Sequence, residues 1–438
     1  MATTLVTGIS ELWTLDPALE DPQRRPIGGI AEDQVIRDAA VVIDGERIAW
    51  TGPARQAPDA DERVDVGGRA ALPGWVDSHS HLIFDGDRSA EFEARMAGES
   101  YAAGGIGVTT AATREADDAR LAALVAGRVH EAVRGGTTCV ETKTGYGLSV
   151  PEETRQAALA ADLVAAGDLD ELTFLGAHLV PSEYDGADGR PGAEDYLALV
   201  TGPMLEAVAP HVRWIDVFCE EGAFTPEQSG AVLRAGAAAG LGLRVHGHQL
   251  GRSGGVELAV RHGAASVDHL NHLNETDIEA LASAATVPVR TLRADGDTVD
   301  APGPVPGMLA VDDGPTVATI LPACDLSTRA PLAPARRLLN AGAELAIASN
   351  CNPGTSYTSS MAFCVATAVL QQHLTLAEAL RAATRGGALA LRRTDVGHLG
   401  VGARADLHVL NAPAAIHLAY RPGMPMTHAV WRRGRRAV

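Results

Sequence analysis

From residue 75 onward, short apolar stretches alternate with alanine-rich stretches that have helical character. Eight of the apolar stretches have the length and composition of buried strands. They are Trp75–His81, Thr137–Lys143, Leu172–Ala177, Trp214–Glu220, Leu243–His248, Ser266–Leu270, Val317–Leu321 and Leu345–Ser349. Between them lie stretches such as Pro151–Ala166 and Pro226–Ala239, in which proline occupies a first-turn position next to acidic residues. Successive strand-then-helix units predict an α/β fold, specifically a parallel (β/α)8 TIM-like barrel.

The two ends of the chain have a different pattern, which predicts a small β-domain. Ala39–Ile43 and Arg47–Trp50 flank an Asp-Gly turn, which is the pattern of a β-hairpin. After residue 388 the alternation of apolar strands with alanine-rich helices ends, and the pattern of His428–Arg432 predicts another strand. We therefore expect a composite β-sandwich domain built from residues 1–72 and 389–438, and a catalytic barrel over residues 73–388.

One connection inside the predicted barrel is unusual. Residues 290–316 are rich in Asp, Gly and Pro and show no periodicity. A structureless loop of that length is uncommon in a compact domain, and it is usually a lid or a mobile insertion. Of the two, we favour a flexible insertion.

The charge balance of the chain excludes several classes of partner. Its 36 basic and 55 acidic residues give a net charge of −19, which repels nucleic acids and anionic membranes. Four arginines near the C-terminal end (Arg432, Arg433, Arg435 and Arg436) read as a solvated end. Neither a membrane span nor a signal peptide is expected from the hydropathy pattern. The five scattered cysteines predict reduced thiols and a cytoplasmic location.

Histidines gather where the predicted strands end. His79 and His81 are two residues apart, so on a strand both imidazoles point to one side, as metal binding requires. Alone, such a pair is as easily two surface histidines after a turn. Other polar residues at strand ends are Lys143, Tyr146, His178, Glu220, Glu221, His246, His248, His269 and Asn350. Because functional side chains of a barrel lie at the carboxyl ends of its strands, this pattern predicts a metal site with hydrolytic chemistry.

Several ordered motifs resemble those of a known family. They are PGWVDSHSHLIFDGDR (73–88), SYAAGGIG (100–107), TTCVETKTGYGL (137–148), TFLGAHLVP (173–181), IDVFCEEGAF (215–224), HGHQL (246–250), VDHLN (267–271) and NCNPGT (350–355). With these motifs the chain resembles the amidohydrolase superfamily and, within it, the imidazolonepropionase family of histidine degradation. The resemblance implies a homodimeric enzyme with one zinc or iron ion. It also implies hydrolytic opening of an imidazolone ring, which converts imidazolonepropionate to N-formimino-glutamate.

The resemblance also assigns roles to single residues. His79, His81 and His246 match the metal-binding histidines of the family. His269 matches the histidine that polarises the attacked carbonyl, and Gln249 matches a residue near the substrate ring. The positions that contact a small heterocyclic carboxylate are Arg88, Tyr101, Tyr146, His178, Asn352, Gly354 and Thr355. An arginine fork and phenols suit a carboxylate on a short arm.

The chain departs from the family pattern at catalytic positions. Asn350 stands where the family has an aspartate that ligates the metal and takes the proton of the attacking water. An amide still offers an oxygen, but it cannot act as a base. His248 is an extra imidazole two residues from His246, so on a strand it shares that residue's face and becomes a candidate base. We therefore expect His269, Gln249, His248 and Asn350 to form the catalytic set.

Two other functions are compatible with these departures. A divergent paralogue with weak or no metal binding would cyclise, isomerise or deaminate a related heterocyclic amino-acid derivative. A non-catalytic paralogue would only bind a ligand, although a mere scaffold has no need of the retained pocket motifs. Metal analysis distinguishes the hydrolase from the first alternative, and turnover of an imidazolone distinguishes an enzyme from the second.

Overall fold

The structure is a computed structural model that describes residues 2–19, 35–98, 105–184, 192–285 and 314–438. Two of the sequence predictions lie outside these ranges. They are the substrate contact at Tyr101 and almost all of the flexible insertion at residues 290–316.

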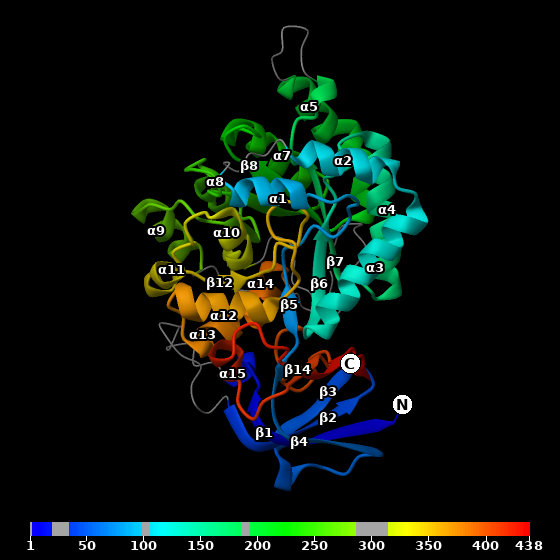
Figure 1. The fold of residues 1–438 in the computed structure, drawn as a ribbon, viewed down its shortest axis with the longest axis vertical. Helices are drawn as coiled ribbons and strands as arrows, with labels where there is room; N and C mark the ends of the chain where they lie inside the picture. Colours follow the sequence, from blue (N-terminus) through cyan, green and yellow to red (C-terminus); the bar gives the residue numbers. More distant parts are fainter. Residues whose placement is uncertain (1, 20–34, 99–104, 185–191, 286–313) are drawn as a thin grey trace.

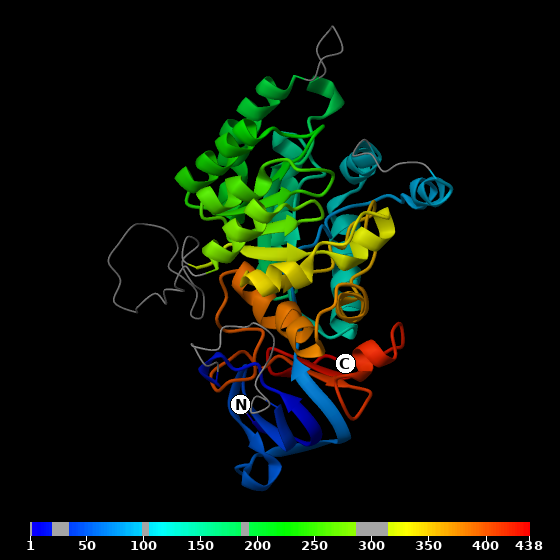
Figure 2. The same ribbon diagram turned by 90° about the vertical axis from the view of Figure 1, so that its left-hand side faces the viewer.

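Eight parallel strands form the centre of the larger part of the molecule. Each strand pairs with its neighbour in the sequence, so the order across the sheet from β5 to β12 is the same as the order along the chain. Their bounds are β5 (Trp75–Asp77), β6 (Thr137–Lys143), β7 (Glu171–Ala177), β8 (Trp214–Cys219), β9 (Gly242–Gly247), β10 (Ser266–His269), β11 (Val317–Ile320) and β12 (Leu345–Ile347). Helices surround these strands in Figures 1 and 2. The predicted (β/α)8 barrel is confirmed.

The barrel closes where its first and last strands meet. The Asp77 carboxylate at the end of β5 accepts hydrogen bonds from the backbone N–H of Ser349 at 3.0 Å and from its hydroxyl at 2.5 Å. Just beyond, Ser80 and Cys351 form a parallel bridge. A buried, ionisable side chain therefore joins the first and the last strand of the barrel.

The helices of the barrel begin where the sequence provides caps. Thr225, Asn274 and Thr375 each form a capping box at the start of α7, α9 and α13. The bounds of the helices are α1 (Ser89–Met96), α2 (Ile106–Glu115), α3 (Asp118–Arg134), α4 (Val150–Ala166), α5 (Ala193–Leu199), α6 (Leu205–Val208), α7 (Pro226–Ala238), α8 (Gly255–Arg261), α9 (Glu275–Ala284), α10 (Pro322–Thr328), α11 (Ala335–Ala341), α12 (Met361–Gln371), α13 (Leu376–Arg381), α14 (Gly387–Ala390) and α15 (His417–Tyr420).

A second sheet takes strands from both ends of the chain, and both termini lie at this end of the molecule in Figures 1 and 2. The order is β15-β14-β13-β4-β1-β2-β3, with β13 antiparallel to β4. The bounds are β1 (Thr3–Trp13), β2 (Val35–Asp44), β3 (Arg47–Pro53), β4 (Glu62–Pro73), β13 (Leu407–Leu410), β14 (Thr427–Arg432) and β15 (Arg435–Arg436). This is the additional β-domain that the sequence predicts. Its boundaries at residues 72 and 389 are our proposal.

An ion cluster joins this sheet to the base of the barrel. Asp170, immediately before β7, lies 2.9 Å from the Arg432 guanidinium and 3.1 Å from that of Arg433, and it also pairs with Arg404. Although burial favours the neutral acid, these arginines hold the pKa of Asp170 well below its usual range. The prediction of a solvated arginine end is therefore wrong for Arg432 and Arg433. It failed because their partner lies more than 260 residues away in the sequence.

All five cysteines are buried, and no disulfide occurs in the described part of the chain. Within the same part, none of the helices combines the length and the apolar character that crossing a bilayer requires.

Candidate active site

Three histidines converge at the mouth of the barrel. His79 and His81 follow β5, while His246 lies in β9 on the opposite side. The Nε2 atom of His81 is 3.3 Å from Nε2 of His79 and 3.4 Å from Nε2 of His246, and all three side chains are buried. All the candidate ligand atoms lie within 4.8 Å of one another. The structure thus brings together the three predicted metal ligands.

Carboxylates behind two of these rings orient them. Nδ1 of His79 lies 2.7 Å from Asp268, and Nδ1 of His246 lies 3.0 Å from Asp216. Asp268 accepts a hydrogen bond from Nδ1–H of His79, and the nearby Asp216 favours the same tautomer of His246, which leaves a lone pair on Nε2 of each ring. Burial lowers the pKa of His79 well below its usual value, which keeps the ring neutral.

Buried cations hold these carboxylates in turn. Lys143 places its Nζ 2.8 Å from Glu141 and 3.2 Å from Asp216. Arg244 lies 3.4 Å from Asp268. The charges beneath the histidines therefore compensate one another, which a group of buried acids requires.

This arrangement fits a divalent metal ion. Lone pairs aimed at one point repel each other unless a cation lies between them. Zinc–nitrogen bonds of about 2.0–2.1 Å in tetrahedral geometry place neighbouring ligand atoms about 3.3 Å apart. The separations of 3.3 and 3.4 Å between the Nε2 atoms match that spacing. The chemistry and the geometry of the donor set are thus those of a metal centre.

Asn350 lies beside the three histidines and faces the same pocket. Its backbone is in the left-handed region with φ of 50°, and its N–H donates to the His79 carbonyl at 2.9 Å. The side-chain oxygen is buried and has no hydrogen-bond partner among the described residues. A neutral oxygen is therefore available at the position where the family places an aspartate.

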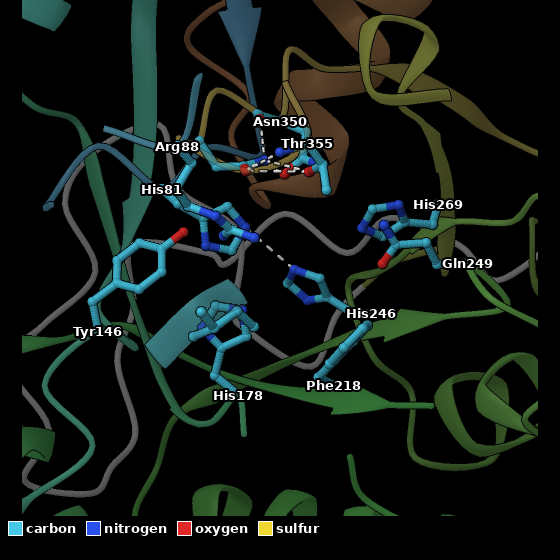
Figure 3. Close-up of a pocket in the computed structure, with 12 residues that line it drawn as sticks. His81, Arg88, Tyr146, His178, Phe218, His246, Gln249, His269, Asn350 and Thr355 are labelled. Carbon is cyan, nitrogen blue, oxygen red and sulfur yellow. Dashed lines mark hydrogen bonds between the residues drawn. The ribbon is translucent and has the colours of Figure 1, made fainter. Parts of the chain in front are cut away.

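The pocket above the histidines is lined from several strand ends (Figure 3). In that view, Tyr146 and His178 lie on one side of His81, and His269 and Gln249 lie beyond His246. The lining residues are His81, Arg88, Ile106, Tyr146, His178, Phe218, His246, Gln249, His269, Asn350, Asn352 and Thr355. This described lining contains no carboxylate.

His178 and His269 are the imidazoles of the lining that are not candidate metal ligands. Nδ1 of His178 lies 2.9 Å from the Gly145 carbonyl, and its ring stacks on His81 with centroids 5.6 Å apart. Burial lowers the pKa of His178 to about 4. His269 ends β10 with φ of 85°, and its Nδ1 has no hydrogen-bond partner in the described structure. Both rings can therefore offer a neutral imidazole to a bound molecule.

The loop after β12 is held by its own side chains. The Asn352 amide oxygen accepts from the backbone N–H groups of Gly354 at 2.9 Å and Thr355 at 2.8 Å. Its amide nitrogen donates to the Asn350 carbonyl at 2.7 Å. Asn352 therefore fixes the shape of the loop, and Gly354 and Thr355 are positioned by it. Any side chain at position 354 would collide with the Arg88 guanidinium, since its Cβ would lie 2.3 Å from a guanidinium nitrogen.

Gln249 reaches the pocket from the turn that follows β9. Its backbone N–H donates to Glu220 at 2.5 Å, and its side-chain nitrogen lies 3.9 Å from the sulfur of Cys324. Burial raises the pKa of Glu220 to about 7. Glu220 thus anchors the turn that presents Gln249, although it does not itself line the pocket.

The expected position of His248 is wrong. β9 ends at Gly247, and His248 takes a left-handed backbone with φ of 63°, so it no longer shares a strand face with His246. Its Nδ1 lies 2.9 Å from the His272 carbonyl, and the ring does not line the pocket. The structure therefore gives no support to His248 as the base that replaces aspartate.

Sequence reasoning missed several residues that shape this site. Asp216 and Asp268 orient metal-site histidines, and Phe218 supplies an apolar wall. All three lie inside the motifs that carry the family resemblance: Asp268 and Phe218 are within two residues of a strand-end residue, and Asp216 is four residues before Glu220. For the two aspartates, the available signal was a carboxylate inside a predicted buried strand, which needs a partner.

Comparison with known proteins agrees with the fold and the site. The sequence profile of the amidohydrolase family matches residues 70–435. An imidazolonepropionase of Micrococcus luteus is 64% identical, with 100% of both chains covered, and one of Arthrobacter sp. (strain FB24) is 58% identical, with 99% of both covered. The chain belongs to the amidohydrolase family and is a hydrolase that acts on C–N bonds. Within that family, these full-length relatives place it with the imidazolonepropionases.

Solved structures share the fold at low sequence identity. Atrazine chlorohydrolase of Arthrobacter aurescens TC1, complexed with zinc, is 19% identical with a TM-score of 0.65, covering 99% of this chain and 94% of its own. An adenosine deaminase of Xanthomonas campestris with bound zinc is 17% identical with a TM-score of 0.64, covering 99% and 92%.

Proposed function

We propose that the protein is an imidazolonepropionase that hydrolyses imidazolonepropionate to N-formimino-glutamate. The observation that carries this proposal is the 64% identity, over the full length of both chains, to a protein of that name. The pocket chemistry supports it, because Arg88 and Tyr146 line the same cavity as His81 and His246, which are two of the three converging histidines. Such a cavity suits a small heterocycle with a carboxylate on a short arm.

The reaction adds water across a ring C–N bond. The carbonyl carbon gains the oxygen of water, the ring nitrogen gains a proton, and no oxidant or reductant takes part. His79, His81 and His246 would hold one divalent ion, zinc or iron. When bound, that ion would act as a Lewis acid beside the attacked carbonyl. His269, at the edge of the pocket, would contact the carbonyl oxygen, and Gln249 would contact the ring.

The carboxylate arm would be held on the other side of the pocket. Arg88 supplies a guanidinium, with Tyr146 and His178 beside it. Tyr101, outside the described residues, remains a proposed contact to the same arm. Asn350 can hold a water molecule through its amide oxygen but cannot remove a proton from it. Among the described lining residues, only imidazoles could receive that proton.

The proposal also includes the cellular location of the protein and its oligomeric state. The five buried, unpaired cysteines support a cytoplasmic protein. A homodimer follows from the family resemblance alone.

The test is turnover of imidazolonepropionate by the purified protein, together with its metal content per chain. We expect N-formimino-glutamate as the product by mass spectrometry, and one divalent ion per chain by elemental analysis. His246→Ala should abolish both the bound metal and the turnover. A metal-loaded protein that leaves imidazolonepropionate unchanged would refute the proposal and favour a non-hydrolytic paralogue.

A further inference from the structure

Three charged residues follow one side of helix α1 from its N-cap, and one of them, Arg88, lines the pocket. Arg88 precedes the helix, and Glu91 binds it with both carboxylate oxygens, each 2.7 Å from a guanidinium nitrogen. Arg95, one turn further on, has a nitrogen 3.7 Å from the same carboxylate. The three residues therefore form one ion cluster.

The pair formed by Arg88 and Glu91 is nearly fixed in place. The Arg88 side chain is only 3% exposed. A Cβ at Gly105 would lie 2.2 Å from its guanidinium, and one at Gly354 would lie 2.3 Å from it. The guanidinium thus occupies a slot between two glycines, which leaves only part of its donor edge for a substrate.

By itself this pair is a weak anion site. Glu91 takes two donors of Arg88 and also cancels its positive charge, so an incoming carboxylate would meet a neutral ion pair. The carboxylate of Glu91 is, moreover, the group that would repel an anion at short range.

Arg95 restores the positive charge. Its side chain is 4% exposed and does not line the pocket. One guanidinium nitrogen donates to the Gly354 carbonyl at 3.0 Å, in the loop that carries Asn352 and Thr355. With Arg95, these three described side chains together carry one net positive charge. Both arginines are buried, so little solvent screens their charge, whereas Glu91 is 32% exposed.

We propose that Arg95 is a positioning residue that determines specificity for an anionic substrate arm. The positive charge of Arg95 offsets the negative charge of Glu91. Glu91 can therefore hold the Arg88 guanidinium in place while that guanidinium still attracts a carboxylate. This inference rests on the proposed function, because it requires a substrate with a carboxylate arm.

The experiment compares Arg95→Met, which removes the charge, with Arg95→Lys, which keeps it. The probes are imidazole-4-propionate and its carboxamide, and binding to the metal-loaded enzyme is measured by calorimetry. We expect Arg95→Met to weaken binding of the carboxylate about tenfold and to leave binding of the carboxamide within about twofold. Arg95→Lys should retain most of the preference. In turnover, Arg95→Met should raise KM more than it lowers kcat, because the grip is the same in ground and transition states.

Glu93→Gln on the exposed face of α1 is the matched control, and it should change neither affinity. Equal losses for the carboxylate and the carboxamide in Arg95→Met would show that Arg95 merely supports the loop, and would overturn this inference alone. A wild-type enzyme that binds both probes equally would overturn the inference together with the carboxylated substrate of the proposed function.

Discussion

Asn350 offers the proposed metal centre a fourth ligand atom, which is an uncharged amide oxygen. An imidazole binds a metal through a neutral ring, so this ligand set would supply no negative charge of its own. Its acids lie one layer behind, at Asp216 and Asp268, where Lys143 and Arg244 offset them. At the scale of single residues, the balance of charge is therefore unlike that of a site with a carboxylate ligand.

Replacing the Asn350 amide by a carboxylate is the most direct test of this charge balance at the metal site. Asn350→Asp should tighten metal binding and raise the rate of imidazolonepropionate hydrolysis, because a carboxylate both attracts the ion and accepts a proton. General-base help is typically worth about 10²–10⁴ in rate. Metal affinity can be measured by chelator competition, and kcat by product formation. Weaker metal binding together with a lower kcat would show that the pocket is adapted to the amide.

The carboxylate behind His79 should matter for metal affinity although it touches no substrate. Asp268→Asn should weaken metal binding about 10–100-fold, because the amide no longer fixes the proton on Nδ1 of His79. Chelator competition measures the effect. Asp65→Asn, an exposed acid in β4 of the small sheet, is the control and should leave affinity unchanged. Equal affinities of wild type and Asp268→Asn would remove Asp268 from the metal site.

At the scale of elements, the contact between Asp77 of β5 and Ser349 after β12, called the β5–β12 seam here, should affect both the stability of the fold and metal binding. Ser349→Ala removes the hydroxyl that donates to Asp77 at 2.5 Å in a buried position. We expect the free energy of unfolding to fall by about 1–3 kcal/mol, since a buried carboxylate oxygen loses its partner. Urea unfolding measures this.

Because the seam carries His79 on one side and Asn350 on the other, metal affinity should fall as well. Ser149→Ala, before α4, is the control: its side chain makes no capping bond to that helix. If Ser349→Ala were as stable as wild type, the seam would have to be held by backbone pairing alone.

Elements were more predictable than the turns between them. The sequence predicts a strand over Thr137–Lys143 and a helix over Glu275–Ala284, and β6 and α9 have these same bounds, because hydrophobic periodicity marks both and a capping residue precedes the helix. Near the amino end the sequence indicates a strand only over Glu11–Leu15, whereas β1 runs from Thr3 to Trp13, since its polar residues give little strand signal. His248 shows the general limit: one left-handed residue after a strand redirects a side chain, and no periodicity predicts it.

Most contacts between side chains far apart in the sequence also could not be predicted from sequence patterns. The histidine cluster could be predicted because parallel strands end at one edge, which fixes the relative position of distant residues. The arginine cluster on Asp170 depends instead on residues of the small sheet that meet the barrel, and the Arg95 contact to Gly354 depends on helix α1 meeting the loop after β12. No repeating geometry relates such positions.

At the scale of the whole molecule, the junction of barrel and small sheet contains a buried titratable group. His408 in β13 packs on Trp75 of β5 with ring centroids 5.4 Å apart, and burial lowers its pKa to about 3. In the unfolded chain the ring titrates near pH ~6.5. Between these values the unfolded state binds more protons, so stability should fall as the pH decreases from about 6.5 toward 3.

His408→Gln should flatten that pH dependence by up to about 1.4 kcal/mol per pH unit. Urea unfolding at several pH values in this range measures the slope. His130→Gln, at an exposed position on α3, is the control and should leave the slope unchanged. An identical slope in His408→Gln and wild type would mean that His408 is not neutral in the folded protein.

The composite sheet also orders events during synthesis. Residues 404–433 leave the ribosome only after every barrel strand has done so, yet they supply β13, β14 and the arginines that surround Asp170. Until then, a nascent barrel would contain a buried acid without its counter-charges, and β4 would have an unpaired edge. Completion of the native fold therefore requires residues 404–433, and a ribosome-bound chain that stops before residue 404 should be a substrate for chaperones.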